Sequence, residues 1–130
     1  MQNNANEMAV FNTAIYVRLS KEDIVAAQSG RESNSITNQK QLILDFLKDK
    51  PEFNIVSIRI DDGYTGTNFD RPAFQRMLND IKAGRINCVV VKDLSRFGRE
   101  YINSGKYIHR LFPVLGVRLI AINDNSDTIT

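Results

Sequence analysis

The sequence predicts a single-domain α/β protein with a mostly parallel central sheet of four to five strands flanked by helices. Short β-rich apolar runs alternate with amphipathic helical stretches along the 130 residues, an order typical of parallel sheets with helices on their faces. Residues 86–91 are continuously apolar, as in strands that are covered on both faces. Hydrophobic residues make up 42% of the chain, which is a globular composition.

The N-terminal part of the chain predicts a tail, a strand and a helix. Residues 1–12 are expected to be a tail, because their first residues are rich in Asn and form no apolar run. Residues 13–19 form a β-rich run, which predicts the first strand. Asn34 or Ser35 is expected to cap a helix that continues to about residue 49, since apolar residues recur there at helical spacing.

A second strand, a loop and a second helix are predicted next. The strand covers residues 53–60, and the turn-forming residues 61–68 must then be a loop. Asp70 is expected to be the N-cap of the helix, with Pro72 at its first position and Gly84 at its end. The apolar residues of this helix, at positions i, i+3, i+4 and i+7, are Phe74, Met77, Leu78 and Ile81.

The C-terminal part predicts two more strands around a third helix. Residues 86–91 form the buried strand, in which Cys88 is expected to be plain core. A helix is predicted over about residues 100–115, with Pro113 disturbing its last turn. Residues 116–122 predict the fourth strand. The resulting β-α-β-α-β-α-β order indicates a largely parallel sheet.

Composition excludes several classes of protein and leaves the partner open. A single cysteine allows no internal disulfide, and the sequence contains no Cys/His cluster for zinc. Neither a secretory signal nor an apolar run of roughly 20 residues is present, so we expect a cytoplasmic protein without membrane contact. The net charge of +2 is too small to indicate nucleic acid by itself. A phosphate-facing patch or a solvated face are both compatible with the basic residues Arg96, Arg99, Lys106 and Arg110.

Sites in open α/β sheets gather beyond the carboxyl ends of the strands, and the first two predicted strands end on polar residues. Arg18 and Ser20 face the same way along the first strand, so the arginine can hold a phosphate while the hydroxyl attacks it. The pair alone is equally compatible with an ordinary strand-end serine beside a solvent-exposed arginine. Asp61 and Asp62 come directly after the second predicted strand, where the loop begins. They are turn formers, or one of them orients an arginine or relays a proton.

The stretch after the buried strand is the most informative. Arg96 and Arg99 are three residues apart, so one helical turn places both on one face. Two guanidinium groups there suit the oxygens of a phosphoryl transition state, although an exposed basic loop is the alternative. His109 is the only histidine and lies in a predicted helix, which disfavours a Ser-His-Asp triad. The sequence also lacks the glycine-rich loops that bind NTP or dinucleotides.

Three blocks of the sequence resemble the serine recombinases, the resolvase/invertase family. The blocks are residues 16–20 (YVRLS), 62–72 (DGYTGTNFDRP) and 93–99 (DLSRFGR), and they occur in the family's order. The resemblance implies a site without metal or cofactor, in which Ser20 is the nucleophile. It also implies site roles for Arg18, Gln39, Asp62, Arg71, Arg96 and Arg99.

The third block departs from the small resolvases and invertases, which carry an aspartate where this chain has Ser95. The Asp-Leu-Ser-Arg form resembles the large serine recombinases of conjugative transposons and phage integrases, as does the long loop of residues 21–34. This departure puts an acid/base role at position 95 in doubt, and Asp93 is not expected to supply one.

The resemblance further implies what the domain does and with what. Residues 13–130 would be the catalytic domain, truncated at its C-terminus, because family members continue into a long helix and DNA-binding domains. Double-stranded DNA would be the substrate, cut through a 5′-phosphoserine link by dimers and tetramers of the full-length protein. Two other functions stay open: a non-catalytic regulator on the same scaffold, and a phosphate-binding enzyme acting on small molecules, which would lack its usual loop.

Overall fold

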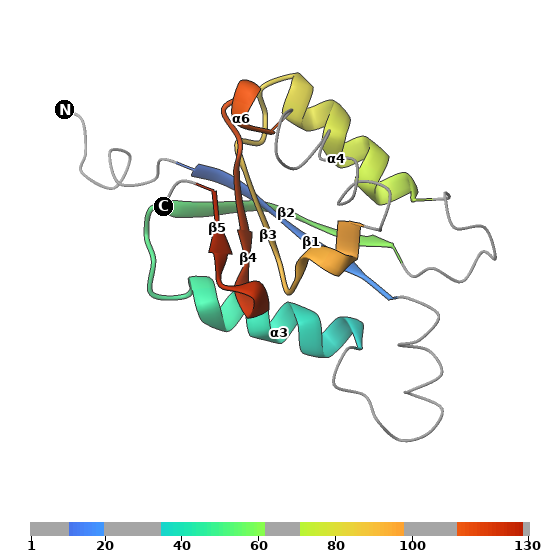
Figure 1. Ribbon diagram of the computed structural model, residues 1–130, viewed down its shortest axis with the longest axis vertical. Coiled ribbons are helices and arrows are strands. Elements are labelled where there is room, and N and C mark those ends of the chain that lie inside the picture. Colours follow the sequence, from blue (N-terminus) through green and yellow to red (C-terminus); the bar gives the residue numbers. More distant parts are fainter. Residues whose placement is uncertain (1–10, 20–34, 62–70, 98–111, 129–130) are drawn as a thin grey trace.

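The computed structural model describes residues 11–19, 35–61, 71–97 and 112–128. Its centre is a five-stranded sheet in the order β2-β1-β3-β4-β5 (Figure 1). The first four strands pair in parallel and β5 is antiparallel to β4, so the predicted mostly parallel sheet is confirmed. The strands are β1 (Phe11–Arg18), β2 (Phe53–Asp61), β3 (Cys88–Val91), β4 (Arg118–Ala121) and β5 (Ser126–Asp127).

Helices cover both faces of the sheet. Figure 1 shows α3 (Ile36–Leu47) on one face and α4 (Pro72–Lys82) on the other. Three short helical turns follow the later strands and lead into them: η1 (Leu94–Phe97), α6 (Phe112–Val114) and η3 (Ile122–Asp124). This three-layer arrangement is the architecture that the alternation of strands and helices predicts.

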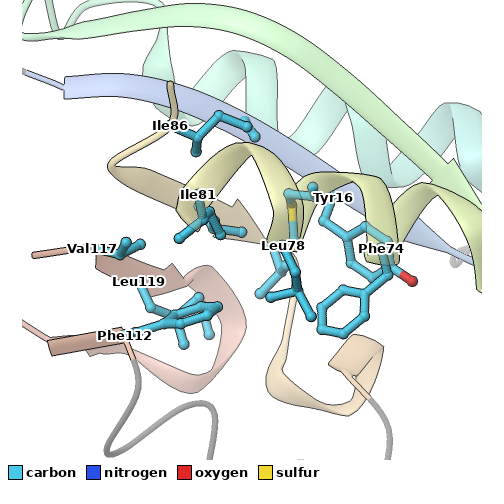
Figure 2. Packing of buried hydrophobic residues seen from close by; sticks show 13 residues of the cluster. Tyr16, Phe74, Leu78, Ile81, Ile86, Phe112, Val117 and Leu119 are labelled. Carbon is cyan, nitrogen blue, oxygen red and sulfur yellow. The ribbon is translucent and has the colours of Figure 1, made fainter. Parts of the chain in front are cut away.

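The core consists of two clusters, one on each face, because neighbouring strand residues point to opposite faces. In β3, Val89 and Val91 pack on the α4 side while Cys88 and Val90 pack on the α3 side. All four are fully buried, so the prediction of a strand covered on both faces is confirmed, although β3 begins at Cys88, two residues after the predicted start. On the α4 side, Figure 2 shows Tyr16 beside Phe74, with ring centroids 5.3 Å apart. The other buried members of that cluster are Ala14, Met77, Leu78, Ile81, Ile86, Phe112, Val117, Leu119 and Ala121.

The first predicted helix and the end of the second are confirmed, with small shifts in bounds. Ser35 is the N-cap of α3, and its Oγ accepts a hydrogen bond from the Asn38 amide at 3.1 Å. The helix ends at Leu47, two residues before the predicted end. Gly84 follows α4 with a φ of 82°, a left-handed conformation that glycine adopts without strain.

Three sequence predictions are corrected near the strand ends. β1 begins at Phe11, so the predicted start at residue 13 is wrong by two residues. Asp61 was predicted to lie in a loop, but it is the last residue of β2. The N-cap of α4 is Arg71 and not Asp70, because a carboxylate from β2 takes the role of the cap, as described below. Pro72 does occupy the first helical position.

The third predicted helix lies largely outside the described residues, which resume at residue 112. There α6 contains Pro113, and the fully buried Phe112 joins the core. Leu115, the last residue of the predicted helix, follows α6 and is exposed. The fourth strand is shorter than predicted, from Arg118 to Ala121. Within the described ranges, no helix has the length and apolarity required to cross a bilayer.

Candidate active site

The candidate site lies at the edge of the sheet where the parallel strands β1, β2 and β3 end, which we call the carboxyl edge. Arg18 and Asp61, the last residues of β1 and β2, are partners in the strand register. η1 follows β3 directly at this edge. The chain therefore brings the ends of three strands together, as expected for a site in an open α/β sheet.

Four of the seven predicted site residues are described and gather at this edge: Arg18, Gln39, Arg71 and Arg96. Ser20, Asp62 and Arg99 lie outside the described residues. Gln39 is fully buried in α3, Arg96 is 4% exposed in η1, and Arg71 is 9% exposed at the start of α4. The burial of Arg96 contradicts the alternative that its segment is an exposed basic loop.

The peptide group between Arg18 and Leu19 is held at both ends. Its carbonyl oxygen, from Arg18, accepts hydrogen bonds from Gln39 Nε2 at 3.0 Å and Arg96 Nη1 at 2.8 Å. Its N–H, from Leu19, donates to the Asp61 carbonyl oxygen at 3.0 Å. Residues of α3, η1 and β2 therefore fix the backbone immediately before Ser20.

Arg18 and Arg96 hold each other through side chain and main chain. Arg18 Nε donates to the Arg96 carbonyl oxygen at 3.0 Å, and Arg18 Nη2 donates to the Ser95 carbonyl oxygen at 3.0 Å. Arg96 donates in return to the Arg18 carbonyl, as above. Because hydrogen bonds from charged donors are stronger than neutral ones, this exchange ties η1 firmly to the end of β1.

Two aspartates hold η1 in place. Asp93 Oδ1 accepts from Arg96 Nε at 3.2 Å and also from the Ser95 hydroxyl. Asp124 Oδ2 accepts from the Leu94 amide at 2.7 Å, at the start of the turn. Asp93 is thus a structural hydrogen-bond acceptor for Arg96 and for Ser95, the residue that differs from the aspartate of the small resolvases.

Asp61 lies at the centre of this edge, although the sequence named it only as one of a pair with Asp62 and the family resemblance assigned a site role to Asp62 alone. It is 5% exposed, and its carboxylate accepts from the Tyr16 hydroxyl at 2.9 Å and from the Ala73 and Phe74 amides at 2.9 and 3.0 Å. Two adjacent acids before a glycine favour a turn, which obscured that the first of them still belongs to the strand. Asp61 is assigned to the strand only because it pairs with Arg18 in the register of β2 against β1.

The pKa of the Tyr16 phenol is shifted by the charged groups at this edge. Burial, followed by the charge of Asp61 and the hydrogen bond to it, raises the pKa of the Tyr16 phenol far above its usual range. The positive charges of Arg71 and Arg18 oppose that rise in pKa, so both guanidinium groups lie within electrostatic reach of the phenol. Tyr16 therefore remains a hydrogen-bond donor at neutral pH.

Comparison with known families shows to which family the chain belongs. The sequence model of the family described as "Resolvase, N terminal domain" matches residues 13–130. The chain belongs to this family. It is a serine recombinase catalytic domain, an enzyme of site-specific DNA recombination whose family implies a DNA substrate and oligomeric assembly in general.

Solved structures of serine recombinases resemble the domain. The N-terminal catalytic domain of TP901-1 integrase is 24% identical, with 92% of this chain and 82% of that chain covered and a TM-score of 0.72. A resolvase family site-specific recombinase from Streptococcus pneumoniae is 27% identical, with coverages of 92% and 77% and a TM-score of 0.73. The catalytic domain of ISC1926 TnpA, an IS607-like serine recombinase, is 19% identical, with coverages of 85% and 69% and a TM-score of 0.60. No curated protein sequence matches the chain significantly.

Proposed function

We propose that this domain cuts and rejoins DNA strands through a covalent 5′-phosphoserine link on Ser20. The observation that carries the proposal is the immobilised Arg18–Leu19 peptide, whose carbonyl and N–H are bonded to three different elements. A nucleophile benefits from a fixed approach, because correct orientation of reacting groups removes much of the entropic barrier. Ser20 follows this peptide directly in the sequence.

In the proposed reaction, Ser20 Oγ attacks the phosphorus of a DNA phosphodiester. The Oγ–H and P–O3′ bonds break and the Oγ–P bond forms, and the leaving 3′ oxygen takes up one proton for the one that Oγ loses. Rejoining reverses these steps, with a 3′ hydroxyl attacking the phosphoserine, so the phosphoester energy is retained without ATP. Arg18, Arg71, Arg96 and Arg99 are assigned to the charge that develops on the phosphoryl oxygens, without a metal ion.

Gln39 and Asp62 complete the proposed site. Gln39 acts by holding the Arg18 carbonyl through its amide, whereas Asp62 is assigned as an acidic group of the site by family resemblance. An arginine cluster that lowers the pKa of the Ser20 hydroxyl is the hypothesis that fits this set of residues.

The assembly and setting are also part of the proposal. Residues 13–130 act as the catalytic domain of a longer cytoplasmic recombinase, which binds double-stranded recombination sites as a dimer and tetramer. On its own, the chain of 130 residues associates weakly or is monomeric, and it does not recombine DNA unaided. Integration or excision of a mobile element is the proposed role, in line with the integrase and IS607-like recombinase that it resembles.

A nicked suicide substrate tests the chemistry in the full-length recombinase. We expect a covalent protein–DNA adduct that disappears in Ser20→Ala and persists in Ser126→Ala, a matched change in the distant strand β5. An adduct that survives Ser20→Ala sinks the assignment of the nucleophile. The absence of any adduct from the wild-type protein, under conditions where it binds the site, supports the non-catalytic regulator instead.

A further inference from the structure

We propose that Asp61 is a positioning residue that couples Arg71 to the strand end leading to Ser20. The inference rests on the proposed function, which places Ser20 and Arg71 in the cleavage site. Asp61 is not among the site residues assigned above. It lies at the end of β2 and is only 5% exposed, although it carries a carboxylate. Its side chain binds the start of α4, next to Arg71, and its main chain binds Leu19, next to Ser20.

The side chain of Asp61 caps the helix that begins after Arg71. Its Oδ1 accepts from the Ala73 amide at 2.9 Å and its Oδ2 accepts from the Phe74 amide at 3.0 Å. The first amides of a helix have no partner within the helix, and the side chain of the N-cap residue Arg71 makes no capping hydrogen bond. A carboxylate from another element therefore fixes the N-terminus of α4, where negative charge is also favoured by the helix dipole.

The main chain of Asp61 holds the other partner. Its carbonyl oxygen accepts from the Leu19 amide at 3.0 Å, one residue before Ser20 in the sequence. Asp61 is also the register partner of Arg18. A single residue thus links the backbone before the nucleophile to the backbone that carries Arg71.

The chemistry at Asp61 requires a carboxylate and not an amide. Three donors converge on its two oxygens, because the Tyr16 hydroxyl also donates to Oδ2 at 2.9 Å. An asparagine has one acceptor oxygen, and its NH2 group would face an amide N–H. Asp61→Asn therefore breaks the cap of α4 while leaving the size of the residue and its main-chain bond to Leu19 unchanged.

The test compares two ends of the same helix in the full-length recombinase. We expect Asp61→Asn to lower the rate of adduct formation on the nicked substrate by about tenfold or more, since small misplacements of a site group are costly. The matched control is Asp80→Asn, near the far end of α4, which weakens the ion pairs to Arg59 of β2 and to Arg85, a residue just beyond the helix. The control is expected to stay within about twofold of wild type.

A second background separates positioning from general stability. In Arg71→Ala, the arginine that Asp61 positions is gone, so adding Asp61→Asn is expected to change the remaining rate by less than about twofold. The decrease in unfolding temperature caused by Asp61→Asn should persist in that background. Equal fold losses with and without Arg71, or an equal loss in Asp80→Asn, would overturn the proposal.

A milder variant serves if Asp61→Asn does not fold. Tyr16→Phe removes one donor to Oδ2 and leaves both helix amides bonded. We expect a loss of about threefold that vanishes in Arg71→Ala, and an unchanged rate or a loss that persists there contradicts the proposal. Failure of the proposed function looks different, because wild-type protein then forms no adduct or Ser20→Ala keeps it.

Discussion

The two edges of the sheet both hold a largely buried arginine, but they use it in different ways. At the edge where the parallel strands begin, which we call the amino edge, Arg118 makes two hydrogen bonds to Asp127 at 2.9 and 2.7 Å. Its guanidinium lies 4.9 and 5.0 Å from the ring centroids of Phe11 and Phe53, which stack on each other. At the carboxyl edge, Arg96 also pairs with a carboxylate, that of Asp93, but its Nη1 donates to the backbone carbonyl of Arg18.

This difference indicates what each edge is for. Arg118 is bound by a carboxylate and two aromatic rings from three other strands, an arrangement that holds these strands together and stabilises the sheet. Arg96 and Arg18 bind main-chain carbonyls of each other's segments, so they fix the course of the chain next to Ser20. Stability and chemistry are therefore expected to separate between the two edges when either arginine is removed.

The largest expected effect is on cleavage by Arg96→Ala. This change removes a donor to the Arg18 carbonyl and one of the proposed contacts to the phosphoryl oxygens. We expect adduct formation to fall by about 100-fold or more, in the range seen when one stabiliser of transition-state charge is removed. Rates on the nicked substrate measure this, and a loss of less than about fivefold would remove Arg96 from the site.

Arg118→Ala should show the opposite pattern. Losing the bidentate ion pair and the cation–π contacts is expected to lower the free energy of unfolding by about 2 kcal/mol. Urea denaturation of the domain measures that loss, with Asp127→Asn as a companion that retains the aromatic contacts and costs less. Cleavage by the folded fraction is expected to remain within about twofold of wild type, and a tenfold loss would show that the edges are not independent.

Gln39→Leu sharpens the comparison at the carboxyl edge. The Arg18 carbonyl then keeps the hydrogen bond from Arg96 and loses the one from Gln39, at a cost of about 1 kcal/mol in unfolding free energy. We expect adduct formation to fall by about tenfold. Gln41→Leu is the control on the same helix, because Gln41 is exposed and its amide donates to Asp45 one turn further along α3.

The sequence was sufficient to locate the four parallel strands to within a few residues, because the signals of single strands and helices are local. The apolar run around Cys88 predicted a strand covered on both faces, and helical spacing from Phe74 to Ile81 predicted the buried face of α4. Ser35 was predicted as a cap and acts as one, since its partner Asn38 is three residues away. Such contacts depend on residues that are close in the sequence.

The site required contacts between distant residues, which no local pattern contains. The bond between Arg18 and Arg96 spans 78 positions, and that from Phe74 to Asp61 crosses from a helix to a strand. Family resemblance pointed to Arg18, Gln39 and Arg96, but it gave no indication that they meet at one carbonyl. It pointed to Asp62 rather than Asp61, because the role of Asp61 depends on the register of β2 against β1.

The smallest expected effect is an alkaline change at Cys88, which begins β3 beside Arg118 in the strand register. Burial raises the pKa of the Cys88 thiol from 9.0 to about 12. A group whose pKa is raised on folding contributes stability that is fully present below its unfolded pKa and is lost as the pH rises towards its folded pKa. Between pH 9.0 and about 12, the unfolding free energy should therefore fall more steeply in wild type than in Cys88→Ala. Parallel pH profiles for the two proteins would show that the thiol titrates alike in the folded and unfolded states, and that the amino edge does not bury it as tightly as its packing indicates.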